Sequence, residues 1–185
     1  MSDLEPERAI SSKFVEQIAK LCGLEVLRAG RHVLRDERGW KTAEMHVLAV
    51  WIAEIEPTFM EHACICMITT ERDQRAFFCV DRDHEVVTIG PITGERSDPV
   101  KDLLQGLDLW TARRTISVDG IAYRFYLDTQ DVRLALYFAN PAVAALVRFE
   151  GALLQVTAEL EKHDSTGTVA RYRSEWRGYA AEAPL

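Results

Sequence analysis

The amino-acid sequence predicts an α+β fold, in which a mostly antiparallel sheet is flanked by an N-terminal helix and by a long helix that follows a C-terminal three-strand meander. Segments of alternating apolar and polar residues cluster in the chain, with charged turns between them. Asp119-Gly120 joins two such segments, which is typical of a β-hairpin. An apolar seam at helical spacing then runs from residue 142 to residue 160. Clustered strands with flanking helices favour an α+β arrangement.

A helix from about Pro6 to Cys22 is the first predicted element. Ile10, Phe14 and Ile18 recur at helical spacing, and Gly23 follows them at the position where glycine commonly ends a helix. Two short strands are then expected, over residues 24–28 and 31–35, before a charged loop at residues 35–39.

The pattern of residues 44–56 allows two interpretations. Met45, Trp51 and Ile55 belong to a helical stripe, but β-branched and aromatic residues are frequent in the same segment. Periodicity alone does not distinguish a short buried helix from a buried strand. We favour a strand that ends at Pro57, because β-branched and aromatic side chains are enriched in strands.

Three further strands and a short helix are expected in the middle of the chain. The Gly90-Pro91 pair is expected to end the last of these strands. Asp98 can cap a helix that begins at Pro99 and ends near Gln105. The three strands cover residues 63–70, 75–80 and 85–89.

The last part of the chain predicts the meander and its covering helix. The meander covers residues 109–138, and Asn140 is expected to cap the long helix, with Pro141 as the first helical residue. The seam of this helix suits packing against the sheet, and its regular period also allows pairing with a second copy in a homodimer. The seam consists of Ala142, Leu146, Phe149, Leu153, Val156 and Leu160.

The size and composition of the chain indicate one globular domain. A single α+β domain is expected over residues 1–163, and a C-terminal tail over residues 164–185 begins where Asp164-Ser-Thr-Gly167 interrupts the helical pattern. The formal net charge of −7 disfavours nucleic acid and anionic membranes as partners. Four cysteines, with no apolar secretory segment near the start of the sequence, favour a reducing cytoplasmic location.

His62, Cys64 and Cys66 are the strongest candidates for a metal site. On a strand these side chains point to one face, and Cys79 on a neighbouring strand would add a fourth zinc ligand. However, thiols two residues apart on a strand are separated by roughly 6–7 Å, which is further than a shared zinc ion allows. We therefore predict no metal and no other cofactor, and the alternative is a metal-binding or metal-dependent enzyme that uses these four residues.

Other candidates for catalysis have structural explanations. The segment from Asp81 to Glu85 gathers carboxylates around His84, but it is expected to be a solvated turn between strands. His32 and His46 are expected to be satisfied or surface side chains. The sequence lacks the phosphate-binding loop, the nucleophile elbow and the zincin motif. These observations favour a protein without enzymatic activity.

A non-enzymatic cytoplasmic module that binds another protein is the function that the sequence favours. Chaperones, adaptors, immunity-type inhibitors and accessory subunits belong to this class. The tail predicts a short helix with aromatic residues on one face, and Tyr and Trp are frequent anchors of protein interfaces. The predicted partner-binding residues are Tyr172, Trp176 and Tyr179.

Overall fold

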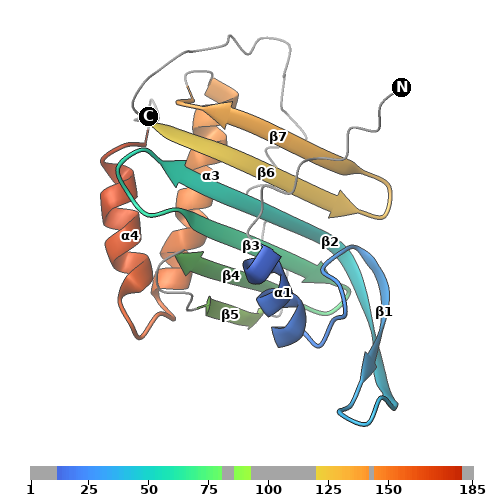
Figure 1. Ribbon diagram of the computed structural model, residues 1–185. Coiled ribbons are helices and arrows are strands. Elements are labelled where there is room, and N and C mark those ends of the chain that lie inside the picture. Colours follow the sequence, from blue (N-terminus) through green and yellow to red (C-terminus); the bar gives the residue numbers. More distant parts are fainter. Residues whose placement is uncertain (1–11, 81–85, 93–119, 142–143, 181–185) are drawn as a thin grey trace.

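A computed structural model describes residues 12–80, 86–92, 120–141 and 144–180 of the 185-residue chain. The described residues form a three-layer structure, with helix α1 on one face of a seven-stranded sheet and helices α3 and α4 on the other (Figure 1). Every strand pair in this sheet is antiparallel. The prediction of an α+β fold with a mostly antiparallel sheet is confirmed.

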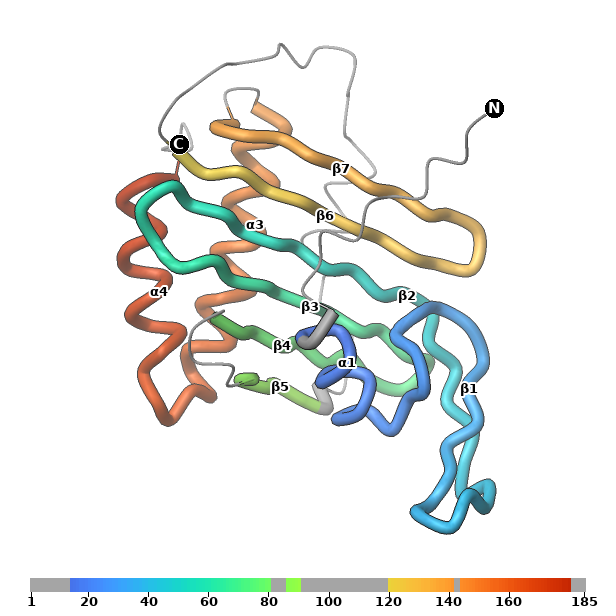
Figure 2. Tube along the Cα trace, viewed as in Figure 1, coloured from blue at the N-terminus to red at the C-terminus, as the bar shows by residue number. Residues whose placement is uncertain are grey.

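The long strand β2 is the centre of the sheet. The order is β5-β4-β3-β2-β6-β7, and β1 pairs with the first part of β2. Figure 2 shows that β6, from late in the chain, lies against β2 from its first half, and that β7 lies on the other side of β6. The strands are β1 (Gly30–Arg35), β2 (Lys41–Pro57), β3 (Ala63–Thr70), β4 (Gln74–Val80), β5 (Val86–Ile92), β6 (Ile121–Thr129) and β7 (Arg133–Ala139).

One face of the sheet packs against α3 (Ala144–Glu161) and α4 (Thr168–Arg177). Alternate strand residues point to this face and become buried, as the period of two requires. Phe125 meets Phe149 of α3 edge-on, with ring centroids 4.9 Å apart. The seam of α3 is largely buried in this core, so it covers the sheet of its own chain rather than offering an apolar stripe to a second copy.

The opposite face packs against α1 (Ser12–Leu21). Gly23, at φ 69°, ends the helix in the left-handed conformation that glycine adopts readily. The N–H of Leu24 then donates to the carbonyl of Ala19 at 2.8 Å, and the Leu24 side chain is buried beside the helix. The predicted strand over residues 24–28 is therefore wrong, because its first apolar residue closes the end of α1 and the chain continues as a loop.

Residues 44–56 lie within strand β2, which confirms the favoured interpretation. Trp51 and Ala53 point to the α3 face while Val50 and Ile52 point to the α1 face. Because both faces are covered, both sets of side chains are apolar, and this gives the continuous run that imitates a buried helix. Strand β5 also continues through Gly90-Pro91 to Ile92, so the predicted strand end at that pair is wrong.

The link from β7 to α3 includes residues 142 and 143, which lie outside the described residues, and so does the predicted helix start next to Asn140 and Pro141. Asn140 has a φ of 46°, and its side-chain oxygen accepts a hydrogen bond from the N–H of Ile121 at 2.9 Å. This side chain therefore holds the start of β6, while the first described residue of α3 is Ala144. Strand β6 pairs with β2 on one side and with β7 on the other. The predicted strand before Asp119-Gly120, the turn at residues 81–85 and the helix at residues 98–105 lie outside the described residues.

Helix α4 packs into the same core as α3 and the sheet. Val169, Tyr172 and Trp176 are buried members of that core. The pattern break at residues 164–167 is a tight link between the two helices, in which Asp164 accepts the N–H of Val169 at 2.7 Å. Among the described helices, none is both long enough and apolar enough to cross a membrane.

Candidate functional site

A hairpin arm extends from the sheet beside the turn between β3 and β4 (Figure 1). It consists of residues 30–46, which are β1, the turn after it and the first part of β2. Residues 41–46 pair only with β1 within the described chain, whereas β2 joins β3 from Val47 and β6 from Ala49. The arm is thus a two-stranded ribbon whose outer edges carry no neighbouring described strand.

The tip of the arm presents a tryptophan to solvent. Asp36 fixes the turn, because its side-chain oxygen accepts the N–H groups of Arg38 at 3.0 Å and of Trp40 at 2.8 Å. Gly39 adopts a φ of 80°, and its carbonyl accepts a hydrogen bond from the Arg35 guanidinium at 2.9 Å. Trp40 is nevertheless 72% exposed. The turn therefore fixes the backbone at Trp40, while the side chain stays exposed to solvent.

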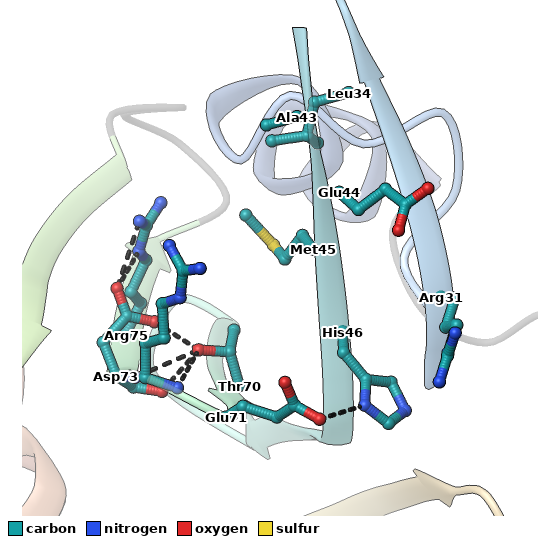
Figure 3. Close-up of a pocket in the computed structure, with 11 residues that line it drawn as sticks. Arg31, Leu34, Ala43, Glu44, Met45, His46, Thr70, Glu71, Asp73 and Arg75 are labelled. Carbon is teal, nitrogen blue, oxygen red and sulfur yellow. Dashed lines mark hydrogen bonds and ion pairs between the residues drawn. The ribbon is translucent and has the colours of Figure 1, made fainter. Parts of the chain in front are cut away.

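Hydrogen bonds connect the base of the arm to the turn after β3, to β6 and to the turn after β6. His46 Nδ1 hydrogen-bonds to the Glu71 carboxylate across 2.6 Å (Figure 3). Its other ring nitrogen makes a hydrogen bond with the Gln130 amide. The hydrogen bond from His46 lowers the pKa of Glu71. The N–H of Ala29, just before β1, donates to Asp128 of β6 at 3.1 Å.

A pocket of about 520 Å³ lies between the base of the arm and the turn that joins β3 to β4 (Figure 3). Thr70 fixes this turn, since its hydroxyl accepts the N–H of Asp73 and donates to the Asp73 carboxylate at 2.7 Å. Arg75 donates to the other carboxylate oxygen of Asp73 from two nitrogens, at 3.3 and 3.2 Å. The described lining is Arg31, Leu34, Ala43, Glu44, Met45, His46, Thr70, Glu71, Arg72, Asp73 and Arg75.

The chemistry of this pocket suits reversible binding. Thr70 carries the one hydroxyl of the described lining, and this hydroxyl donates to the Asp73 carboxylate, which is itself paired with Arg75. An ion-paired carboxylate is a weak base, so this contact suits a role in holding the turn. His46 and Glu71 form a proton-holding pair, but that pair also fastens the arm. The guanidinium groups of Arg31 and Arg72 lie near Glu71, and both help to lower its pKa.

The three predicted partner-binding residues differ in how far their side chains are buried. Tyr172 is 4% exposed and Trp176 is fully buried, whereas Tyr179 is 43% exposed. The Tyr172 ring meets Phe78 edge-on, with centroids 5.5 Å apart. In the described structure Tyr179 is the most accessible of the three residues, and Tyr172 forms part of the wall of a pocket beside residues 58–62. The helical spacing of Tyr172 and Trp176 reflects packing onto the sheet.

A buried polar group that the sequence did not indicate explains the position of Trp176. Its indole N–H donates to the Tyr123 hydroxyl at 2.9 Å, and that hydroxyl donates to Glu150 of α3. Burial raises the pKa of Tyr123, and the neighbouring Glu150 adds to the shift. Glu150 is 1% exposed. It occupies a helix position between Leu146 and Leu153 on the seam side, and this charge within an apolar stripe was the available signal.

The alternative metal ligands do not converge. Cys64, Cys66 and Cys79 lie on the α1 side of the sheet, where Cys66 and Cys79 are buried and Cys64 is partly buried. His62 precedes β3 and is exposed. Within the described ranges, no three His, Cys, Asp or Glu side chains are grouped so that they would hold one metal ion.

Comparison of the chain with protein-family models, with curated proteins and with solved structures gives no match. The main evidence on function is therefore the geometry of the arm and its pocket.

Proposed function

We propose that this protein is a non-enzymatic module that binds another protein through the hairpin arm. The observation that carries the proposal is Trp40, which is 72% exposed at the tip of an arm whose turn and base are both held by hydrogen bonds. An exposed tryptophan gains much apolar contact when a partner covers it, and tryptophan is enriched among the residues that dominate binding energy.

The edges of the arm support the same proposal. A strand edge offers unpaired N–H and C=O groups, and an extended segment of a partner can add to it as a further strand. The fastened base matters because a preformed arm loses little conformational entropy when a partner binds. Arg31 and Arg72 at the pocket can pair with acidic groups of such a partner.

The proposed class of function is still that of a chaperone, adaptor, inhibitor or accessory subunit. The proposed contact surface, however, is the hairpin arm and no longer the helical surfaces. The helical surfaces favoured by the sequence are largely occupied by the sheet, since most of the α3 seam is buried and so are Tyr172 and Trp176 of α4. A cytoplasmic setting belongs to this proposal, because the four cysteines carry thiols, which suits a reducing compartment.

Photo-crosslinking in the native host tests the proposal. Benzoylphenylalanine replaces Trp40 in one full-length variant and Phe59 in a matched control, because Phe59 is also aromatic and is 69% exposed, but it lies in the loop between β2 and β3. We expect a discrete cross-linked protein from position 40 and none from position 59. Adding Trp40→Ala to a variant with the photoprobe at Val33 should remove the cross-link.

Two results would contradict the proposal. The first is equal cross-linking from positions 40 and 59, which would indicate random encounters. The second is a cross-link from Val33 that persists in full after Trp40→Ala, which would show that the tryptophan contributes no binding energy.

A further inference from the structure

Two thiols lie directly opposite each other in the sheet. Strands β3 and β4 pair with Cys64 in register with Cys79. Opposite residues of an antiparallel pair point to the same face, with Cα atoms about 4.5 or 5.5 Å apart. Both values lie within the range of roughly 4.4–6.8 Å that a disulfide spans. A bond between these two sulfur atoms therefore joins residues that are already adjacent, and it requires their Cβ atoms to come within about 3.5–4.5 Å of each other.

The other two cysteines are placed differently. Cys66 shares a strand and a face with Cys64, but its partners across the sheet are Ile52 on one side and Phe77 on the other. Burial raises the pKa of the Cys66 thiol well above its usual range, and burial also raises the pKa of Cys22 beside α1. Since the thiolate is the reactive form, both groups are poor nucleophiles at neutral pH.

Access to solvent distinguishes Cys64 from the other cysteines. It is only partly buried, whereas Cys22, Cys66 and Cys79 are buried. The Cys64–Cys79 pair is also one register position from the last pair of the hairpin, Ala63 with Val80, at the end away from the turn. An oxidant thus reaches Cys64 first, and the buried Cys79 lies opposite as the resolving thiol.

We propose that Cys64 and Cys79 are a site of reversible oxidation, at which a hydroperoxide converts the two thiols into a cross-strand disulfide. The Cys64 thiolate attacks one peroxide oxygen, the O–O bond breaks, and the leaving oxygen takes a proton, which yields a sulfenic acid on Cys64. The Cys79 sulfur then attacks the Cys64 sulfur, the S–O bond breaks, and water leaves as the S–S bond forms. The two thiols lose two electrons and the peroxide gains them.

The proposal is tested on the full-length reduced protein with hydrogen peroxide as the probe. We expect the number of thiols titrated in denaturant to fall from four to two, a mass lower by two hydrogen atoms, and a peptide map that joins Cys64 to Cys79. Dithiothreitol should restore all four thiols. The matched variant Cys66→Ser should still form the bond, while Cys79→Ser should accumulate a sulfenic acid that dimedone traps on Cys64.

A second probe avoids any variant. Phenylarsine oxide binds two thiols only when they lie close together, so in the native wild-type protein it should protect Cys64 and Cys79 together from later alkylation. A peptide map that joins Cys22 to Cys66, oxidation of Cys64 to the sulfinic acid without a disulfide, or an arsenical that protects neither member of the pair would each overturn the proposal.

Discussion

Replacing Trp176 by alanine distinguishes a core residue from an interface residue. The fully buried indole contacts Tyr123 and Tyr172, with ring centroids 6.4 Å away in both cases. Truncation of a buried Trp typically costs about 3–5 kcal/mol. The variant also removes the indole N–H that the Tyr123 hydroxyl accepts, and a net hydrogen bond contributes roughly 0.5–1.5 kcal/mol. We therefore expect a loss of about 4–5 kcal/mol in the free energy of unfolding.

Urea denaturation followed by circular dichroism measures this loss. A small domain has a total stability of about 5–15 kcal/mol, so Trp176→Ala should be severely destabilised. The matched control is Tyr179→Ala in the segment just after α4, which removes a half-exposed ring and should change the stability by about 0.5 kcal/mol or less. If Trp176→Ala lost less than about 1 kcal/mol, far below the range for a buried indole, the placement of α4 in the core would be refuted.

Two further predictions concern glycine positions and acid stability. A Cβ on Gly120 would lie 1.6 Å from the Asn140 side-chain oxygen, whereas one on Gly39 meets nothing. Gly120→Ala should thus lower the thermal midpoint clearly more than Gly39→Ala, and equal shifts would contradict this packing. The depressed pKa of Glu71 means that its pairing with His46 contributes stability above pH 4.5, which is lost as the pH falls through the lower folded value. Glu71→Gln should therefore lower the urea midpoint at pH 7, and its difference from the wild type should shrink as the pH falls below 4.5. A difference that stays constant in acid would argue against this linkage.

Much of the strand layout could be predicted because its signals are local. β3 begins and ends at the expected residues, Ala63 and Thr70, since charged turns border an apolar run. β2 was ambiguous because both of its faces are covered, which removes the alternation that identifies a half-buried strand. Leu24 was misassigned because an apolar residue that closes a helix end resembles the start of a strand.

The candidate site could not be predicted, since its parts are distant in the sequence. His46, Glu71 and Gln130 meet only because β3 and β6 both pair with β2, and no local pattern specifies the distant pairing with β6. The aromatic residues of α4 illustrate the opposite difficulty. Tyr172 and Trp176 at helical spacing fit an interface as well as a core, and only the position of the sheet shows that they are buried.

The pairing of β2 with β6 also has a consequence for synthesis of the chain on the ribosome. Pro57 aligns with Ile121 in this ladder, so β2 leaves the ribosome well before its neighbour β6 has been synthesised. Until then a nascent chain presents one bare strand edge with apolar side chains beside it, which is a template for pairing with other chains. Truncated forms that end before residue 120 should therefore aggregate, and refolding should be slow compared with that of small helical proteins.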